Sequence, residues 1–271
     1  MRSTPSTRYS AAICWPGGLA ATIRDGWMVL CDGPRETRLA SLARVPLVHG
    51  GLVAFQVENA LAAAAAAWSL GVPLELVRLG LEDFSGGPLG SPGRFNLLDL
   101  DGATVVVDYG HNVPSLEQIC RTLATLPHPR RTAVYSAAGD RRDEDLLRQG
   151  ELLGRTFGRV VIYEDAYRRG RSPGEITGLI EAGIRRTEPA DRRVLVEPGG
   201  NWAAAASRVL DAVEPGDLVL LQPDTIEQAM PWLTQRYGNR LRGISFDQVA
   251  GVRPPESLPV SPDRAGDSEQ R

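Results

Sequence analysis

Three short segments of the 271-residue chain combine ionisable and amide side chains in the way that ligand sites do. The first runs from Asp108 to Asn112 and follows directly on an uninterrupted apolar and β-branched run, TVVV, at residues 104–107. A run without alternation predicts a strand covered on both faces, and ligands of parallel sheets bind beyond the carboxyl ends of such strands. Asp108 is therefore a candidate site residue. The structural alternative is that Asp108 caps a helix beginning near Pro114.

The other two segments carry charges of both signs. One is GDRRDED, from Gly139 to Asp145, and the other begins at Glu164 and Asp165 and continues through three arginines to Arg171. Each follows a predicted strand, so we expect all three segments to meet at one crevice. Arginine binds phosphate or carboxylate and carboxylates bind guanidinium or ammonium, which predicts a zwitterionic site. The alternatives are a solvated helix start for GDRRDED and exposed ion pairs for the third segment.

The composition excludes several classes of function. All 30 residues counted as Lys plus Arg are arginine, so the chain itself holds neither a GxxxxGK[ST] phosphate loop nor a Schiff-base lysine. A bias toward arginine codons would explain this composition without any function. The net charge of -3 argues against a nucleic-acid surface, and no apolar run is long enough to cross a bilayer.

Cys14, Cys31 and Cys120 lack the spacing of a zinc site or a disulfide framework, and no metal ligand or catalytic residue is assigned from the sequence. No leader pattern is recognised at the start of the chain, so we expect a cytoplasmic protein.

The elements that must position these residues fall into two parts. Residues 20–39 predict antiparallel hairpins with turns at Asp25-Gly26 and Asp32-Gly33, and residues 57–70 and 74–84 predict two helices, the first rich in alanine. The glycine- and proline-rich segment GGPLGSPG, residues 86–93, predicts a linker. We therefore expect an amino-terminal part over residues 1–85, a main domain over residues 92–240 and a disordered tail over residues 241–271.

Strands and helices alternate throughout the main domain. Strands are predicted at residues 94–98, 104–109, 131–138, 159–165, 193–197 and 217–222, and helices at residues 114–126, 143–156, 173–186, 202–213 and 225–237. This alternation predicts an α/β fold with a mostly parallel sheet and helices on both faces.

Six separate motifs, in order, resemble the carboxyl-terminal part of the cyanophycin synthetases, whose wider family is the Mur ligases. They are FQVENALAAAAAAWSLGVP, PGRFN, VVVDYGHN, GDRRDED, EDAYRRGRSPGEI and PGDLVLLQPD. The resemblance covers the chain from about Thr22 to about Arg236. It implies a Rossmann-like Mur ligase C-terminal domain, preceded by the trailing piece of a Mur ligase central domain. It also implies an ATP-dependent ligase that adds arginine to the side-chain carboxylates of a polyaspartate backbone.

The resemblance further implies roles for particular residues. Asn59 matches the asparagine that faces the adenine, Arg94 the arginine that reaches the nucleotide phosphates, and Asp108 the acid that holds the ribose. His111 and Asn112 line the same pocket. The charged segments match regions that grip the incoming amino acid, which implies contacts from Asp140, Arg141, Arg142, Asp143, Glu164, Asp165 and Arg171.

The chain departs from the family at the phosphate loop, because the lysine-bearing loop and the magnesium ligands of the family have no counterpart in it. ATP and Mg²⁺ would thus be bound together with the upstream domain that carries this loop, and we expect the chain alone to be inactive. An upstream ligase half or a further copy of the chain is an expected partner. The chain would be a fragment, a remnant or one subunit of a split enzyme, with arginine or another amino acid and an acidic polypeptide as partners. Two alternatives stay open: a non-catalytic module that binds amino acid or polymer, and a metal-dependent phosphoester hydrolase built on Asp108, Asp140, Asp143 and Asp145.

Overall fold

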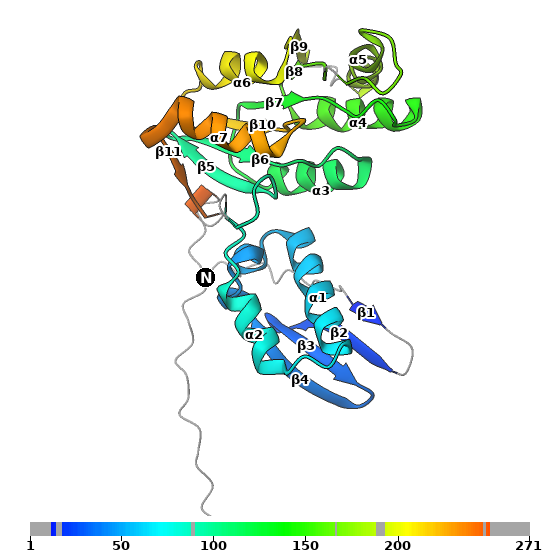
Figure 1. Ribbon diagram of the computed structural model, residues 1–271, viewed down its shortest axis with the longest axis vertical. Coiled ribbons are helices and arrows are strands. Elements are labelled where there is room, and N and C mark those ends of the chain that lie inside the picture. Colours follow the sequence, from blue (N-terminus) through cyan, green and yellow to red (C-terminus); the bar gives the residue numbers. More distant parts are fainter. Residues whose placement is uncertain are drawn as a thin grey trace, which may run out of the picture.

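The computed structural model describes residues 12–14, 18–87, 90–165, 167–187, 193–245 and 248–249, which form two units, each with one sheet and covering helices, joined by the linker (Figure 1). The first unit contains a four-stranded antiparallel sheet in the order β1-β2-β3-β4. Its elements are β1 (Ala12–Cys14), β2 (Leu19–Arg24), β3 (Trp27–Asp32), β4 (Arg35–Ser41), the 3₁₀ turns η1 (Leu42–Arg44) and η2 (Pro46–Gly51), α1 (Ala54–Ser69) and α2 (Leu74–Asp83).

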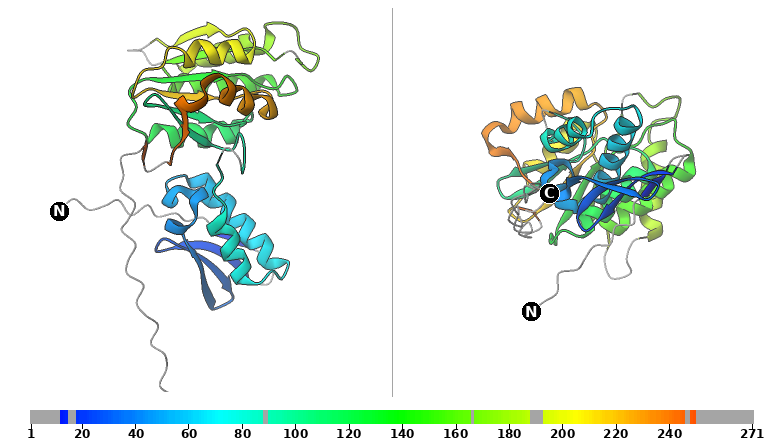
Figure 2. Two further views of the ribbon diagram at one scale, coloured as in Figure 1. Left: turned by 60° about the vertical axis from the view of Figure 1, so that its left-hand side comes forward. Right: turned by 90° about the horizontal axis from the view of Figure 1, so that it is seen from below.

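The predicted hairpins and helices of this unit are confirmed. Asp25 and Gly26, which join β2 to β3, have φ angles of 50° and 77°, the left-handed conformation that a two-residue hairpin turn needs. Helices α1 and α2 cover one face of the small sheet (Figure 2), and alanines of α1 pack closely there with Met28 and Leu30 of β3.

The second unit is built on a seven-stranded sheet in the order β11-β5-β6-β10-β7-β8-β9. Its strands are β5 (Asn96–Leu100), β6 (Ala103–Val107), β7 (Arg131–Tyr135), β8 (Arg159–Ile162), β9 (Leu195–Pro198), β10 (Leu218–Leu221) and β11 (Leu241–Gly243). Its helices are α3 (Val113–Ala124), α4 (Asp143–Thr156), α5 (Glu175–Thr187), α6 (Trp202–Leu210) and α7 (Ile226–Tyr237), followed by the 3₁₀ turn η3 (Gly238–Arg240). The five neighbouring strands β6, β10, β7, β8 and β9 are parallel. At one edge, β5 pairs antiparallel with β6, and β11 pairs antiparallel with β5.

Alternate residues of each central strand enter different cores, because side chains of a strand point to opposite faces. Val106 of β6 lies in the core under α3, α4 and α5, whereas Val105 and Val107 lie in the core under α6 and α7. The continuous apolar run in β6 is thus explained by burial on both faces, as predicted from its lack of alternation.

Two features differ from the sequence-based expectation. Strand β10, which comes late in the chain, is inserted between β6 and β7, so the ends of β6 and β7 are not direct neighbours. Strand β11 pairs with β5 through Leu241 opposite Leu100, inside the segment predicted to be a tail. Most of the rest of that predicted tail, from residue 250 onward, lies outside the described residues.

Candidate functional site

A cavity of about 480 Å³ lies between the two units, at the carboxyl end of β6. We call it the interdomain cavity. This volume is in the range of small-molecule sites. Helix α1 contributes one wall, and the linker, the end of β6 and the start of α3 contribute the others. The lining residues are Leu47, Phe55, Gln56, Glu58, Asn59, Phe84, Ser91, Arg94, Asp108, Gly110, Pro114, Ser115, Gln118 and Ile119.

Asp108 is 7% exposed in the wall of this cavity. Its Oδ2 accepts a hydrogen bond of 2.8 Å from the backbone N–H of Phe95, and its Oδ1 accepts one of 2.6 Å from that of Gly110. Burial raises the pKa of Asp108 to about 6, and the two backbone donors and the positive charge of Arg94 oppose the rise. The carboxylate is therefore ionised at neutral pH, and each oxygen keeps a lone pair for a ligand.

Asp108 also determines the local backbone. Phe95 has a φ of 52°, an uncommon conformation for an aromatic residue, and its N–H points at the Asp108 carboxylate. Gly110 has no side chain where a Cβ would lie 2.8 Å from Oδ1 of Asp108. The alternative that Asp108 caps α3 is wrong, because the cap is Asn112, whose Oδ1 accepts a hydrogen bond of 2.9 Å from Ser115 N.

Polar groups from both units face this cavity. Asn59 on α1 is exposed and donates from Nδ2 to Oε1 of Gln56 at 3.1 Å. Arg94 is exposed, with its guanidinium 6.0 Å from the centre of the Tyr109 ring. An amide pair, a carboxylate and a guanidinium thus surround an opening whose remaining walls include Phe55, Phe84 and Leu47.

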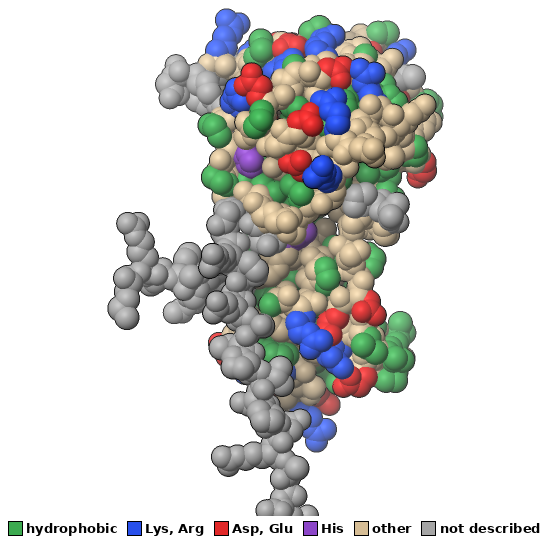
Figure 3. All heavy atoms as spheres, turned by 90° about the vertical axis from the view of Figure 1, so that its left-hand side faces the viewer, with side chains coloured by type: hydrophobic (Ala, Val, Ile, Leu, Met, Phe, Trp, Pro, Cys, Tyr) green, Lys and Arg blue, Asp and Glu red, His purple; other side chains and the backbone are tan. Residues whose placement is uncertain are grey.

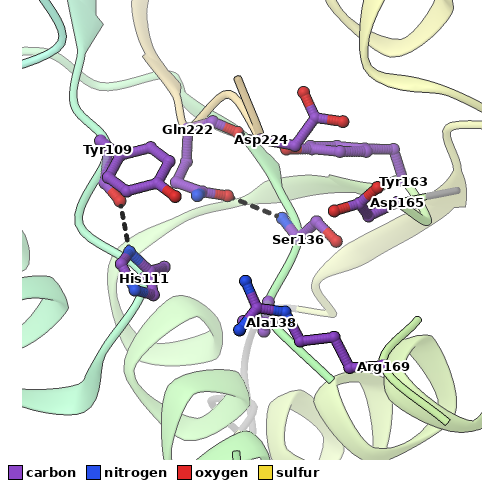
Figure 4. A pocket seen from close by; sticks show the side chains of 10 residues that line it. Tyr109, His111, Ser136, Ala138, Tyr163, Asp165, Arg169, Gln222 and Asp224 are labelled. Atoms are coloured by element: carbon purple, nitrogen blue, oxygen red, sulfur yellow. Dashed lines mark hydrogen bonds between the residues drawn. The ribbon is translucent and has the colours of Figure 1, made fainter. Parts of the chain in front are cut away.

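A second, smaller cavity of about 50 Å³ lies at the carboxyl ends of the parallel strands. We call it the strand-end cavity. In the close-up of Figure 4, Tyr109 and His111 lie on one side, and Tyr163, Asp165 and Asp224 on the other. The lining is completed by Ser136, Ala137, Ala138, Arg169 and Gln222.

Two contacts shape this cavity. Nδ1 of His111 lies 3.0 Å from the carbonyl oxygen of Tyr109. The side chain of Gln222, 4% exposed, accepts a hydrogen bond of 3.1 Å from Ser136 N, which ties the end of β10 to the end of β7. Gln222 and Asp224 were not among the predicted site residues. The signal that points to them is the polar sequence QPD, which directly follows the apolar run of β10.

The predicted charged segments mostly pair with each other. Arg171 donates to the carbonyl oxygens of Gly139 at 2.9 Å and Arg141 at 2.6 Å, and it forms ion pairs with Asp143 at 2.8 Å and Glu175 at 2.6 Å. It therefore holds the loop before α5 against the start of α4.

Other predicted residues are similarly engaged. Arg142 binds both carboxylate oxygens of Asp145 at 3.0 Å, and Asp140 pairs with Arg169 at 2.6 Å. Glu164 accepts a hydrogen bond of 2.8 Å from Gly174 N and lines neither cavity.

The single crevice predicted from the three segments is thus two cavities. Asn59, Arg94 and Asp108 line the interdomain cavity, whereas His111 and Asp165 line the strand-end cavity. The physical reason is the insertion of β10, which separates the end of β6 from the ends of β7 and β8.

The residues of the hydrolase alternative do not gather. Asp140, Asp143 and Asp145 each pair with a different arginine, and Asp108 is bound to backbone amides. Over the described part of the chain, no group of three or more His, Cys, Asp or Glu side chains is placed to hold a metal ion. The hydrolase alternative is therefore not supported, and the described residues do not by themselves fit a Mg²⁺ site.

The second unit is a doubly wound α/β domain with cavities beyond the carboxyl ends of its strands, the class in which such cavities bind ligands. Residues 93–225 match the family described as Mur ligase, glutamate ligase domain. This part of the chain belongs to the Mur ligase family, and its fold is the Rossmann-like fold of the Mur ligase C-terminal domain.

Curated relatives agree with this assignment. The chain is 33% identical over 220 residues to a cyanophycin synthetase of Crocosphaera subtropica, covering 81% of this chain and 25% of the relative. It is 35% identical over 170 residues to a UDP-N-acetylmuramoyl-L-alanyl-D-glutamate–2,6-diaminopimelate ligase of Synechococcus elongatus, covering 62% of this chain and 32% of that ligase. The chain therefore spans about 25% of the length of the cyanophycin synthetases that it matches.

Solved structures share the fold. E. coli FolC in complex with DHPP and ADP matches with a TM-score of 0.58 at 18% identity, over 80% of this chain and 46% of FolC. A bifunctional folylpolyglutamate synthase/dihydrofolate synthase with Mn, AMPPNP and L-glutamate bound matches with a TM-score of 0.54 at 18% identity, over 78% of this chain and 45% of that one. Within the described ranges, none of the helices is both long enough and apolar enough to cross a bilayer.

Proposed function

We propose that this chain is the carboxyl-terminal part of an ATP-dependent acid–amino acid ligase of the cyanophycin synthetase type, which adds arginine to the side-chain carboxylates of a polyaspartate backbone. The observation that carries the proposal is that Asn59, Arg94 and Asp108, which come from three separate motifs, line one cavity of about 480 Å³. The names of the curated relatives and the nucleotides bound in the structures that share the fold support it.

In this proposal the interdomain cavity binds the adenine and the ribose of ATP. Asn59 and Gln56 present amide groups to the adenine, and the Asp108 carboxylate accepts hydrogen bonds from the ribose hydroxyls. Arg94 is exposed beside the cavity and supplies positive charge toward the phosphates, where guanidinium is well suited to bind.

The chain would not form the amide bond unaided. Acyl-phosphate formation requires neutralisation of the phosphate charge by metal and basic groups, and the chain contains no lysine. The lysine and the Mg²⁺ ligands would come from a further segment or from a separate polypeptide. The predicted acidic polypeptide acceptor would approach from the side of that further segment or polypeptide.

Calorimetric titration of the chain with ADP tests the nucleotide part of the proposal. We expect Arg94→Ala to weaken ADP binding roughly 10-fold, because it removes a charged contact to phosphate. The matched control is Arg155→Ala, which removes another exposed arginine in α4, outside both cavities. Equal affinities for the two variants, or no ADP binding to the unmodified chain, would contradict the nucleotide assignment.

Phosphate release tests whether the chain needs a second polypeptide, with the phosphate loop, for turnover. The chain with ATP, Mg²⁺, arginine and polyaspartate should release no phosphate above background, and adding a polypeptide that carries a GKT phosphate loop and the rest of the central domain should restore turnover. Turnover by the chain alone would refute the inference from the missing lysine. Polymer binding that is tight and independent of nucleotide would instead favour the non-catalytic binding module.

A further inference from the structure

Helix α1 is apolar on both of its sides over about two turns. None of residues 60–67 has a polar side chain. The inner side of the helix is buried against the small sheet through Leu61, Ala64 and Ala65, whereas the opposite side faces solvent. Helices that are apolar all round occur where protein covers both sides, so α1 has the sequence of a helix that lies between two layers.

The adjacent helix α2 adds large apolar side chains to the same outer surface. The two helices lie side by side on one face of the small sheet (Figures 1 and 2). Val77 of α2 faces the core of this unit, whereas Leu76 and Leu79 are 58% and 45% exposed. Leu70, directly after α1, is 83% exposed. We call the exposed apolar side chains of the two helices the outer helix face; they are Ala62, Ala63, Ala66, Leu70, Leu76 and Leu79.

The leucines distinguish the outer helix face from an ordinary alanine-rich surface. Exposed alanine is common in helices because alanine is the strongest helix former, but a leucine side chain in water loses the free energy of burial. Seven large apolar side chains are exposed among the described residues, and five of them lie between residues 52 and 84. Exposed apolar side chains gathered in this way mark a surface that another protein covers.

The outer helix face continues an interface within the chain. In the first turn of α1, Phe55 packs against Phe95 of the second unit with ring centroids 5.3 Å apart, and Asn59 lines the interdomain cavity. Ala62 and Ala66 lie on the same side of the helix, because they follow Asn59 by three and seven residues. Ala66 is about 10 Å from Asn59 along the helix axis. A protein that covers the outer helix face therefore also borders the interdomain cavity.

The charge around the outer helix face is acidic. Residues 54–83 contain four acidic side chains and one arginine, Arg78, which already pairs with Glu75 at 2.5 Å. Glu58 and Asp83 are exposed, and neither lies within 4.0 Å of an arginine side chain among the described residues. A partner with basic side chains around an apolar centre fits this surface, whereas a second copy of the chain would place like charges against each other.

We propose that the outer helix face is the docking surface for the polypeptide that supplies the lysine and the other phosphate-binding groups that this chain lacks. The inference rests on the proposed function and names the surface through which the missing part is bound. The partner is defined by its chemistry: an apolar patch with basic side chains around it, and a phosphate-binding lysine at the edge nearest the interdomain cavity. Docking on this surface places that lysine at the cavity that Arg94 and Asp108 line.

The test uses the full chain and, as the probe, the remainder of the Crocosphaera subtropica cyanophycin synthetase, produced without the region that matches this chain. Fluorescence anisotropy of the labelled chain measures binding of the probe without nucleotide. We expect Ala66→Arg to weaken binding by about 10-fold or more, because it places a long charged side chain in the apolar centre of the surface. The matched control is Ala182→Arg on an exposed position of α5, which should bind as the unmodified chain does. Thermal unfolding should be the same for both variants, because both alanines are exposed.

A second variant tests the charge complementarity. Asp83→Arg reverses one charge at the border of the outer helix face. It should weaken binding of the probe, and the loss should be larger at low salt than at high salt, because salt screens attraction between exposed charges. Binding that Asp83→Arg leaves unchanged or tightens at low salt would contradict a basic partner.

Three other results would overturn the proposal. These are equal binding of the probe by Ala66→Arg and the unmodified chain, no binding of the probe at about 100 µM, which detects even transient complexes, and a dimer of the chain in sedimentation that Ala66→Arg dissociates. Titration of the chain with ADP separates this proposal from the proposed function. ADP binding without binding of the probe would refute the docking surface alone, whereas probe binding that Ala66→Arg abolishes, without ADP binding, would refute the nucleotide site alone.

Discussion

Replacing Asp108 with asparagine tests the account of the interdomain cavity most directly. The pKa of Asp108 rises from 3.8 to about 6 on folding, chiefly through burial. This rise in the pKa corresponds to about 3 kcal/mol between the two protonation states. Because the folded state binds this proton more tightly, the stabilising contribution of Asp108 is complete below pH 3.8 and is lost as the pH rises through about 6.

Asp108→Asn removes this titration and keeps the shape of the side chain. We therefore expect the free energy of unfolding of the unmodified chain, measured relative to Asp108→Asn, to fall by about 3 kcal/mol between pH 3.5 and pH 7. Urea unfolding followed by fluorescence of the 5 tryptophans measures it, and the difference between the two proteins cancels the titration of other acids. The backbone amide resonances of Phe95 and Gly110, which donate to Asp108, should titrate near pH 6 in the unmodified chain alone.

Binding provides a second measurement on the same pair of proteins. In the proposed nucleotide site a ribose hydroxyl would donate to the ionised carboxylate of Asp108, so ADP affinity should increase as the pH rises through 6 in the unmodified chain and should vary less in Asp108→Asn. A stability difference that is independent of pH, with amide shifts that do not titrate, would refute the assignment of a buried, perturbed carboxyl group at this position.

Two further changes test how the backbone positions the cavities. The side chain of Asn96 is 1% exposed, accepts a hydrogen bond from Gly93 N and donates to the carbonyl oxygens of Gly86 and Ser91. Asn96→Ala should therefore lower the free energy of unfolding by about 2–4 kcal/mol and make the linker more sensitive to limited proteolysis. An unchanged rate of cleavage would contradict the role of Asn96 in holding the linker. Gly139→Ala places a Cβ 2.1 Å from the carbonyl oxygen of Arg168 and should cost about 1–3 kcal/mol in urea unfolding. Its control, Gly178→Ala in α5, has no heavy atom within 4 Å and should stabilise by about 0.5–1 kcal/mol, so a similar cost for both variants would argue against the close approach at Gly139.

The charged surface of the second unit explains why charge patterns alone predicted the site poorly. Figure 3 shows acidic and basic side chains mixed over one face of this unit. Charged residues of this unit that line neither cavity also form ion pairs, such as Arg236 with Asp211 at 2.6 Å. A segment such as GDRRDED has the composition of a ligand site, yet Arg142 and Asp145 pair with each other within one turn of α4. Sequence composition cannot separate a charge that faces a ligand from one that faces its neighbour.

Local sequence determined the secondary structure and part of the chemistry. The succession of strands and helices follows from apolar runs and turn residues that act over a few positions, and α4 begins and ends where it was predicted, at Asp143 and Thr156. The absence of lysine is likewise a property of the sequence alone, and it restricts the chemistry that the chain can perform whatever its fold.

Only the tertiary structure decided which polar groups meet. The order of strands in the sheet is set by packing and crossover connections between distant segments, and it places Gln222 beside Ser136, 86 positions away in the sequence. The burial that raises the pKa of Asp108, and the ion pair that joins Asp140 to Arg169, arise from the same long-range arrangement. Solvation and ion pairing depend on distances in space, which spacing along the chain does not specify.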